Sequence, residues 1–317
     1  MDRVKRPKVL LLGNGILQTF GGESWSAFLE SIKRRNDISG DLSKINCPEP
    51  LKAILVTNDQ VDVAMKDKCK KIFEQGNISA ELATVLQQLL SMDFDYILTT
   101  NYTYELEQAA IYPQNLTKYK LDKMATSTTG VIDRKYLLHT YNRVNLNGKE
   151  IKIWHIHGEA KKPSSTILGH YYYGNTLFEI KKAVNDIRDI YFDESSDVKT
   201  WAEAFIFADI YCLGFGFGLA EFDLWWLLNR KAREQNNTGK LYFYEPQNEN
   251  DFAKIELLSL MKKVDGSRLV EIIDLDYAKN DNMQWKEFYL TCICDIEKRL
   301  SEPVIHNNHS INNLVLI

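Results

Sequence analysis

Two short segments of this sequence place polar side chains directly after an apolar run that predicts a buried strand. The first segment is Ile97 to Tyr102, which contains Asn101, and the second is Trp154 to Gly158, which contains His157. In an open α/β sheet, ligands bind beyond the carboxyl ends of the strands. We therefore expect Asn101 and His157 to converge at one edge of a parallel sheet, although they lie far apart in the sequence.

Strand-like apolar runs alternate with amphipathic helical patterns along the chain. Helices capped by Ser24 and Ser79, and further helices over 221–232 and 283–300, separate the runs. This alternation predicts an α/β fold with a Rossmann-like, mostly parallel sheet and helices on both faces. The predicted strands cover Lys8–Leu12, Ala53–Val56, Tyr96–Thr99, Ile206–Leu213, Leu241–Tyr244 and Leu269–Ile273.

The dipeptide Asn147-Gly148 lies between two further strand-like segments, Leu137–Val144 and Glu150–His157. Asn-Gly between apolar strands is typical of a type I′ β-hairpin, so the His-x-His segment leaves the second hairpin strand. We interpret residues 1–302 as one domain with helical and β-hairpin insertions at about 24–92 and 113–200. Residues 303–317 form a tail that is either flexible or docks on a partner.

Composition excludes several classes of protein. A net charge of −4 over 317 residues lacks the basic excess that binding nucleic-acid phosphates needs. Five scattered cysteines without a CxxC pair argue against a disulfide framework or a four-cysteine zinc site and predict a reduced, cytoplasmic protein. No apolar stretch approaches the ~20 residues that span a bilayer, so we expect no membrane association.

Two glycine-rich turns follow predicted strands. Gly13-Asn14-Gly15 follows the first strand, and Gly214-Phe215-Gly216 follows the run that ends at Leu213. Such turns let backbone N–H groups approach a diphosphate, although the first turn lacks the third glycine of the dinucleotide fingerprint. Taken in order with Asn101, His157-Gly158 and Glu245, these turns resemble the pattern of the sirtuin family.

Three segments are especially similar to bacterial sirtuin-like proteins, many of which are NAD hydrolases of antiphage defence. They are Thr99 to Tyr102, His155 to Gly158, and Gly214 to Asp223. The resemblance implies that Asn101 and His157 are catalytic. It also implies that the dinucleotide is bound by Gly13, Asn14, Gly15, Thr100, Gly214, Phe215, Gly216, Asp223 and Glu245.

The sequence also departs from the sirtuin pattern. The two CxxC pairs that hold the structural zinc of sirtuin deacetylases are missing, so we expect no zinc module and no bound metal. The Pro-Asp-Phe-Arg element of the first loop is missing as well. Thr103 stands where an aspartate usually follows the asparagine, and Glu105 is close enough to compensate. Protein deacylation is therefore the less favoured activity.

The resemblance predicts an NAD⁺ glycohydrolase that releases nicotinamide and ADP-ribose and acts as a regulated effector of antiphage defence. Cleavage at ribose C1′ needs a base near the ribose hydroxyls and an amide that positions water, the roles assigned to His157 and Asn101. NAD⁺ is the only cofactor expected, as substrate. We further expect a homo-oligomer, with an ATPase or another defence subunit as a partner. The alternatives are a silent module that binds NAD or ADP-ribose, and a subunit of a larger complex.

Other residues near these motifs receive secondary interpretations. His155 is expected to support the loop, while a metal site built from His155, His157 and His170 is a weaker alternative. The aromatic segment Leu168 to Gly174 is expected to form a wall of the pocket.

Overall fold

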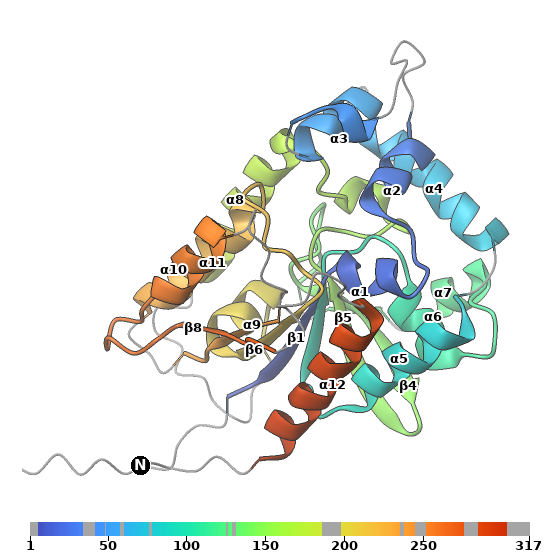
Figure 1. Cartoon of the computed structure of the whole chain (residues 1–317). Coiled ribbons are helices and arrows are strands. Elements are labelled where there is room, and N and C mark those ends of the chain that lie inside the picture. Colours follow the sequence, from blue (N-terminus) through green and yellow to red (C-terminus); the bar gives the residue numbers. More distant parts are fainter. Residues whose placement is uncertain are drawn as a thin grey trace, which may run out of the picture.

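The computed structural model describes residues 6–33, 42–47, 49–57, 60–75, 78–124, 126–128, 131–185, 198–234, 238–244, 252–275 and 285–302. The strands form one eight-stranded sheet with the spatial order β3-β4-β5-β2-β1-β6-β7-β8. Figure 1 shows this sheet with helices packed around it. The strands are β1 (Lys8–Leu12), β2 (Tyr96–Thr99), β3 (Thr126–Thr128), β4 (Thr140–Leu146), β5 (Lys149–His155), β6 (Asp209–Leu213), β7 (Leu241–Tyr244) and β8 (Val270–Ile272).

The strands from β5 to β8 in this order are joined by parallel pairs, whereas β3 and β4 add an antiparallel edge. The chain passes from β1 to β2 on one side and later returns to β6 on the other side of β1. Such a reversal of strand order opens a crevice beyond the carboxyl ends of the strands. The prediction of a Rossmann-like, mostly parallel α/β sheet is confirmed.

Helices cover both faces of the sheet. The side chains of β1 alternate between the faces, with Val9 and Leu11 in one hydrophobic cluster and Leu10 and Leu12 in the other. The first face is covered by α8 (His170–Asn185), α9 (Trp201–Phe207), α10 (Phe222–Arg233) and α11 (Phe252–Leu260). The opposite face is covered by α1 (Asn14–Thr19), α5 (Ala80–Ser91), α6 (Glu105–Ile111) and α12 (Trp285–Ser301).

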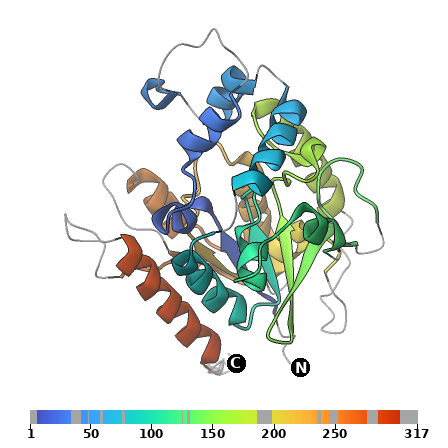
Figure 2. The ribbon, with the colours of Figure 1, turned by 90° about the vertical axis from the view of Figure 1, so that its right-hand side faces the viewer.

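A third layer lies above the carboxyl ends of the strands, as Figures 1 and 2 show. It contains α2 (Trp25–Ser31), α3 (Glu49–Thr57) and α4 (Val61–Gln75), which bury a hydrophobic cluster of their own. The layer also includes α7 (Lys118–Lys123) and the short 3₁₀ helices Leu42–Lys44 and Pro163–Ser165. The predicted insertion at 24–92 thus divides into this layer and α5, which packs on the sheet. The predicted tail, 303–317, lies outside the described residues.

Several local predictions are confirmed by backbone geometry. Ser24 and Ser79 cap α2 and α5, because each hydroxyl accepts a hydrogen bond from the backbone N–H three residues later. Asn147 and Gly148 adopt φ angles of 53° and 88° between β4 and β5, as a type I′ turn requires.

Two predicted strands are wrong in whole or in part. Residues 53–56 belong to helix α3, where Ala53 and Val56 pack on one side in the third cluster. A four-residue apolar run gives the same signal for a buried helix and a buried strand. Ile206 belongs to α9, and Lys231 donates hydrogen bonds from Nζ to the carbonyls of Phe205, Ile206 and Ala208 at the end of that helix, before β6 begins.

Both hairpin strands lie closer to the turn than predicted, because β4 continues to Leu146 and β5 begins at Lys149. β4 begins at Thr140 rather than at residue 137, and β5 ends at His155 rather than at His157. The segment after β5 turns away through Gly158, whose φ is 90°. Among the described helices, none has the length and apolar character that crossing a bilayer requires.

Candidate functional site

A cavity of about 860 Å³ lies at the carboxyl ends of β1, β2, β5 and β6. Its floor comes from the turns that follow these strands, and its walls come from α2, α8 and α12. The volume falls in the range of small-molecule sites, roughly 300–1,000 Å³. The lining residues are Asn14, Gly15, Gln18, Thr19, Glu23, Trp25, Phe28, Thr100, Asn101, Tyr102, Thr103, Glu105, His157, Leu168, Gly169, Tyr173, Gly214, Phe215, Gly216, Phe217, Gly218, Glu221, Trp285, Lys286 and Tyr289.

The two glycine-rich turns pack directly against each other. The N–H of Gly13 donates to the carbonyl of Leu213, and that of Gly15 donates to the carbonyl of Gly214. A side chain at Gly13 would collide with the carbonyl oxygen of Gly214, and Gly214 itself has a φ of 64°. Close contact between the two turns therefore requires glycine at these positions. Gly13 does not line the cavity, whereas Gly15 and Gly214 do.

The turn after β2 brings Asn101 to the cavity. The hydroxyl of Thr99 donates to the carbonyl of Leu12 and accepts a hydrogen bond from the N–H of Asn101, which ties the turn to the end of β1. Thr103 also lines the cavity, and its hydroxyl lies 2.6 Å from Oε2 of Glu105. Burial raises the pKa of Glu105 above its ordinary value, despite this hydrogen bond. The structure thus places the side chain of Glu105 beside Thr103.

His157 lies at the floor of the cavity among acidic side chains. Its Nε2 is 3.0 Å from Oδ2 of Asp223 and 3.7 Å from Oε2 of Glu221. The hydroxyl of Tyr173 donates to the same Glu221 oxygen at 2.9 Å. Burial alone would lower the pKa of His157, but the charge and hydrogen bond of Asp223, with the charge of Glu221, raise it. An imidazole held in this way can carry a proton in an acid–base reaction.

The two acids at His157 occupy different positions. Glu221 lines the cavity, whereas Asp223 is fully buried in the first turn of α10, where its Oδ1 also accepts the N–H of Leu224. Asp223 was predicted to bind the dinucleotide. The structure places it behind His157, where it orients the ring.

A cation is the other group that these side chains could hold. One ligand atom from each of His157, Glu221 and Asp223 lies within 4.8 Å of the other two. Such a nitrogen and oxygen set suits ions such as Mn²⁺. Hydrogen bonds from His157, Tyr173 and the N–H of Leu224 reach three of the four carboxylate oxygens of Glu221 and Asp223. These three side chains form an acid–imidazole cluster at the floor of the cavity.

The His-x-His segment does not form a pair of metal ligands. His155 is directed away from the cavity floor, with its Nε2 2.9 Å from Oε1 of Glu107. His170 contacts the ring of Phe222. The metal site considered from these three histidines is therefore not assembled.

The structure brings most of the predicted residues together. Asn14, Gly15, Thr100, Asn101, His157, Gly214, Phe215 and Gly216 all line the cavity. Leu168, Gly169 and Tyr173 form part of its wall, as predicted for the aromatic segment. Glu245 lies outside the described residues.

Sequence reasoning missed two walls of the cavity. Trp25 and Phe28 come from α2 and also pack in the third hydrophobic cluster. Trp285, Lys286 and Tyr289 come from α12, which follows the predicted motifs by many residues and carries no local signal of a site. Only the packing of α12 beside α1 brings these side chains to the cavity.

The fold and this cavity define an α/β protein of Rossmann-like topology with a candidate acid–base site at the switch in strand order. Comparisons with models of known protein families and with curated proteins find no match for this chain.

Proposed function

We propose that the protein is an NAD⁺ glycohydrolase, which cleaves NAD⁺ to nicotinamide and ADP-ribose. The observation that carries this proposal is the His157–Asp223 pair at the floor of a cavity that Asn101 and both glycine-rich turns also line or support. The order of these elements in the sequence resembles that of the sirtuin-like NAD hydrolases. The size of the cavity supports a ligand as large as a dinucleotide.

The chemistry follows from the charges around His157. Breaking the bond between nicotinamide N1 and ribose C1′ leaves the bonding electrons on nicotinamide and positive charge on the ribose. The cavity-lining carboxylates Glu105 and Glu221 would stabilise that positive charge. Water then forms the new bond to C1′ and gives up a proton, for which neutral His157 is the acceptor. Asn101 would orient the ribose or the attacking water.

The remaining elements of the cavity fit other parts of the dinucleotide. Gly214, Phe215 and Gly216 form a turn next to α1, in which only Phe215 carries a side chain. Backbone groups of such turns can approach a diphosphate closely. Trp25 and Phe28 at one wall and Trp285 at another offer rings on which a base can stack. The biological setting that the resemblance supports is antiphage defence, with a homo-oligomer and a further defence subunit, such as an ATPase, as partners.

The test is direct. Purified protein is incubated with NAD⁺, and nicotinamide and ADP-ribose are quantified by chromatography, beside His157→Gln as a matched variant. Glutamine keeps an N–H donor for the buried Asp223 but cannot act as a base at neutral pH. The proposal expects equal amounts of both products from the wild type and almost none from the variant. Binding of NAD⁺ by calorimetry without any turnover would favour the silent binding module instead.

A further inference from the structure

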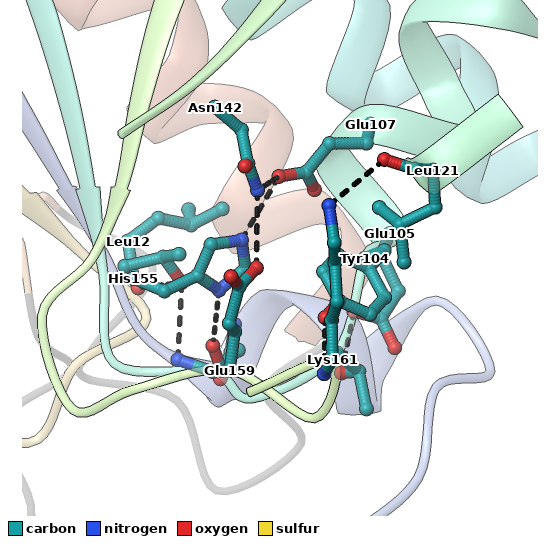
Figure 3. Close-up of polar contacts among 12 residues, drawn as sticks. Leu12, Tyr104, Glu105, Glu107, Leu121, Asn142, His155, Glu159 and Lys161 are labelled. Atoms are coloured by element: carbon teal, nitrogen blue, oxygen red, sulfur yellow. Dashed lines mark hydrogen bonds and ion pairs between the residues drawn. The ribbon is translucent and has the colours of Figure 1, made fainter. Parts of the chain in front are cut away.

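A second buried cluster joins His155 and Asn142 to the acids Glu107 and Glu159 (Figure 3). Nδ1 of His155 is 2.7 Å from the backbone carbonyl oxygen of Asn101, and its Nε2 is 2.9 Å from Oε1 of Glu107. The side-chain amide of Asn142 donates to the same Glu107 oxygen at 3.0 Å and to Glu159 at 3.3 Å. The cluster therefore links α6, β4 and β5 to the turn after β2.

The hydrogen bonds of His155 define its protonation state. A backbone carbonyl and a carboxylate both accept hydrogen bonds, so each ring nitrogen must donate, and the ring is an imidazolium. The charge also offsets two buried carboxylates, Glu107 and Glu159. The pKa of His155 agrees: although burial lowers it, the charge and hydrogen bond of Glu107 raise it to about 9.

The geometry fixes the Asn101 turn from two sides. The hydroxyl of Thr99 holds the N–H of Asn101 and the end of β1, while the imidazolium holds the carbonyl of Asn101. A charge-assisted hydrogen bond is roughly twice as strong as a neutral one. His155 and Glu107 do not line the cavity, so neither can touch a ligand there except through Asn101.

We propose that His155 and Glu107 are positioning residues, which hold the backbone of Asn101 so that its side chain acts on the bound dinucleotide. This inference rests on the proposed NAD⁺ glycohydrolase activity. Loss of the pair would leave the ligand cavity in place but let Asn101 move. Displacement of a catalytic group by about 1 Å can cost on the order of 100-fold in rate.

The experiment compares His155→Gln and Glu107→Gln with the wild type in kcat and KM for NAD⁺. We expect kcat to fall by roughly 10- to 100-fold while KM changes little, since binding groups elsewhere in the cavity remain. The same substitutions are then made in Asn101→Ala. Because alanine has no side chain left to position, the second substitution should cause no further loss of kcat.

Lys231→Met is the matched control for a general loss of stability. Lys231 is fully buried and holds three backbone carbonyls at the end of α9, as His155 holds one at the Asn101 turn. It does not line the cavity. Assayed below its melting temperature, this variant should keep the kcat of the wild type although it is less stable.

The outcomes separate this inference from the proposed function. Equal further losses in the Asn101→Ala background, or a rise in KM with kcat unchanged, would overturn the positioning role. If the wild type releases no nicotinamide, the proposed function fails, and hydrogen–deuterium exchange of residues 99–104 decides the inference alone. Faster exchange there in His155→Gln, but not in Lys231→Met, is the expected result, and unchanged exchange would contradict it.

Discussion

His155 and His157 are two residues apart, yet the structure gives them opposite surroundings. Both are almost fully buried and both contact a carboxylate at about the same distance. Both ring nitrogens of His155 form hydrogen bonds, one with Glu107 and the other with the backbone carbonyl of Asn101. The ring does not line the cavity. The ring of His157 lines the cavity and is backed by Asp223.

The difference comes from the point at which β5 ends. Residues i and i+2 of one strand face the same side of a sheet. His155 is the last residue of β5, and the N–H of Gly158 donates to the carbonyl of His155 in a turn, so the two rings diverge toward α6 and α10. A change of backbone direction over two residues thus separates a positioning histidine from a candidate base.

The largest effect that would sharpen this comparison is expected at His157. His157→Gln should lower the kcat for nicotinamide release by roughly 100- to 10,000-fold, the usual contribution of a positioned acid–base group. Circular dichroism should show an intact fold, because glutamine still donates to Asp223. A folded His157→Gln protein with wild-type turnover would exclude His157 as the base.

The next effect concerns stability at the other histidine. Glu107→Ala removes one partner of a buried ion pair and should lower the free energy of unfolding by about 3–5 kcal/mol, measured with urea. The matched control is Glu150→Ala, which breaks the exposed pair with Arg143 and should cost about 0–1 kcal/mol. Equal losses in the two variants would contradict the role of burial.

The pH dependence of stability tests the charge on His155. Its pKa is about 9 in the folded protein, against 6.5 when exposed. A raised pKa stabilises the fold fully below pH 6.5, and the contribution is lost as the pH rises through about 9. We expect the difference in unfolding free energy between the wild type and His155→Gln to shrink over this range, by up to about 3 kcal/mol. Parallel curves would argue against a buried imidazolium.

A smaller effect is expected in the pH profile of the reaction. His157 must be neutral to accept a proton, and its pKa is raised chiefly by Asp223 against the effect of burial. The rate should therefore rise with pH across this raised pKa. Asp223→Asn should move the rising limb of kcat to lower pH, because the charge and hydrogen bond that raise the pKa of His157 are lost. The pH–rate profiles of both proteins provide the measurement, and an unmoved limb would contradict the pairing.

The smallest effect is expected on removal of metal. The carboxylates near His157 have hydrogen-bond partners without a cation, so prolonged dialysis against EDTA should leave NAD⁺ cleavage unchanged. Elemental analysis accompanies the assay. Stoichiometric metal, with activity lost on its removal and restored on its return, would replace the acid–base role of His157 with ligation by the cluster of His157, Glu221 and Asp223.

Local sequence patterns determined the elements that depend on neighbouring residues. The caps at Ser24 and Ser79, the turn at Asn147-Gly148 and the buried strand Tyr96–Thr99 follow from side-chain and backbone preferences within a few residues. The position of Asn101 and His157 at strand ends was predictable for the same reason. Their meeting at one cavity required only the rule that parallel strands end at one edge.

The tertiary structure alone decided which of these side chains contact one another and which helices complete the cavity. Asp223, Glu221 and Tyr173 reach His157 from α10 and α8, and Trp285 reaches the cavity from α12. No pattern within a helix encodes the partner that lies across a sheet. The same limit applies to residues 53–56 and to Ile206, because a short apolar run is buried equally well in a helix or a strand. Contacts between distant segments, such as those of Lys231 with the end of α9, favour either the helix or the strand for such a run.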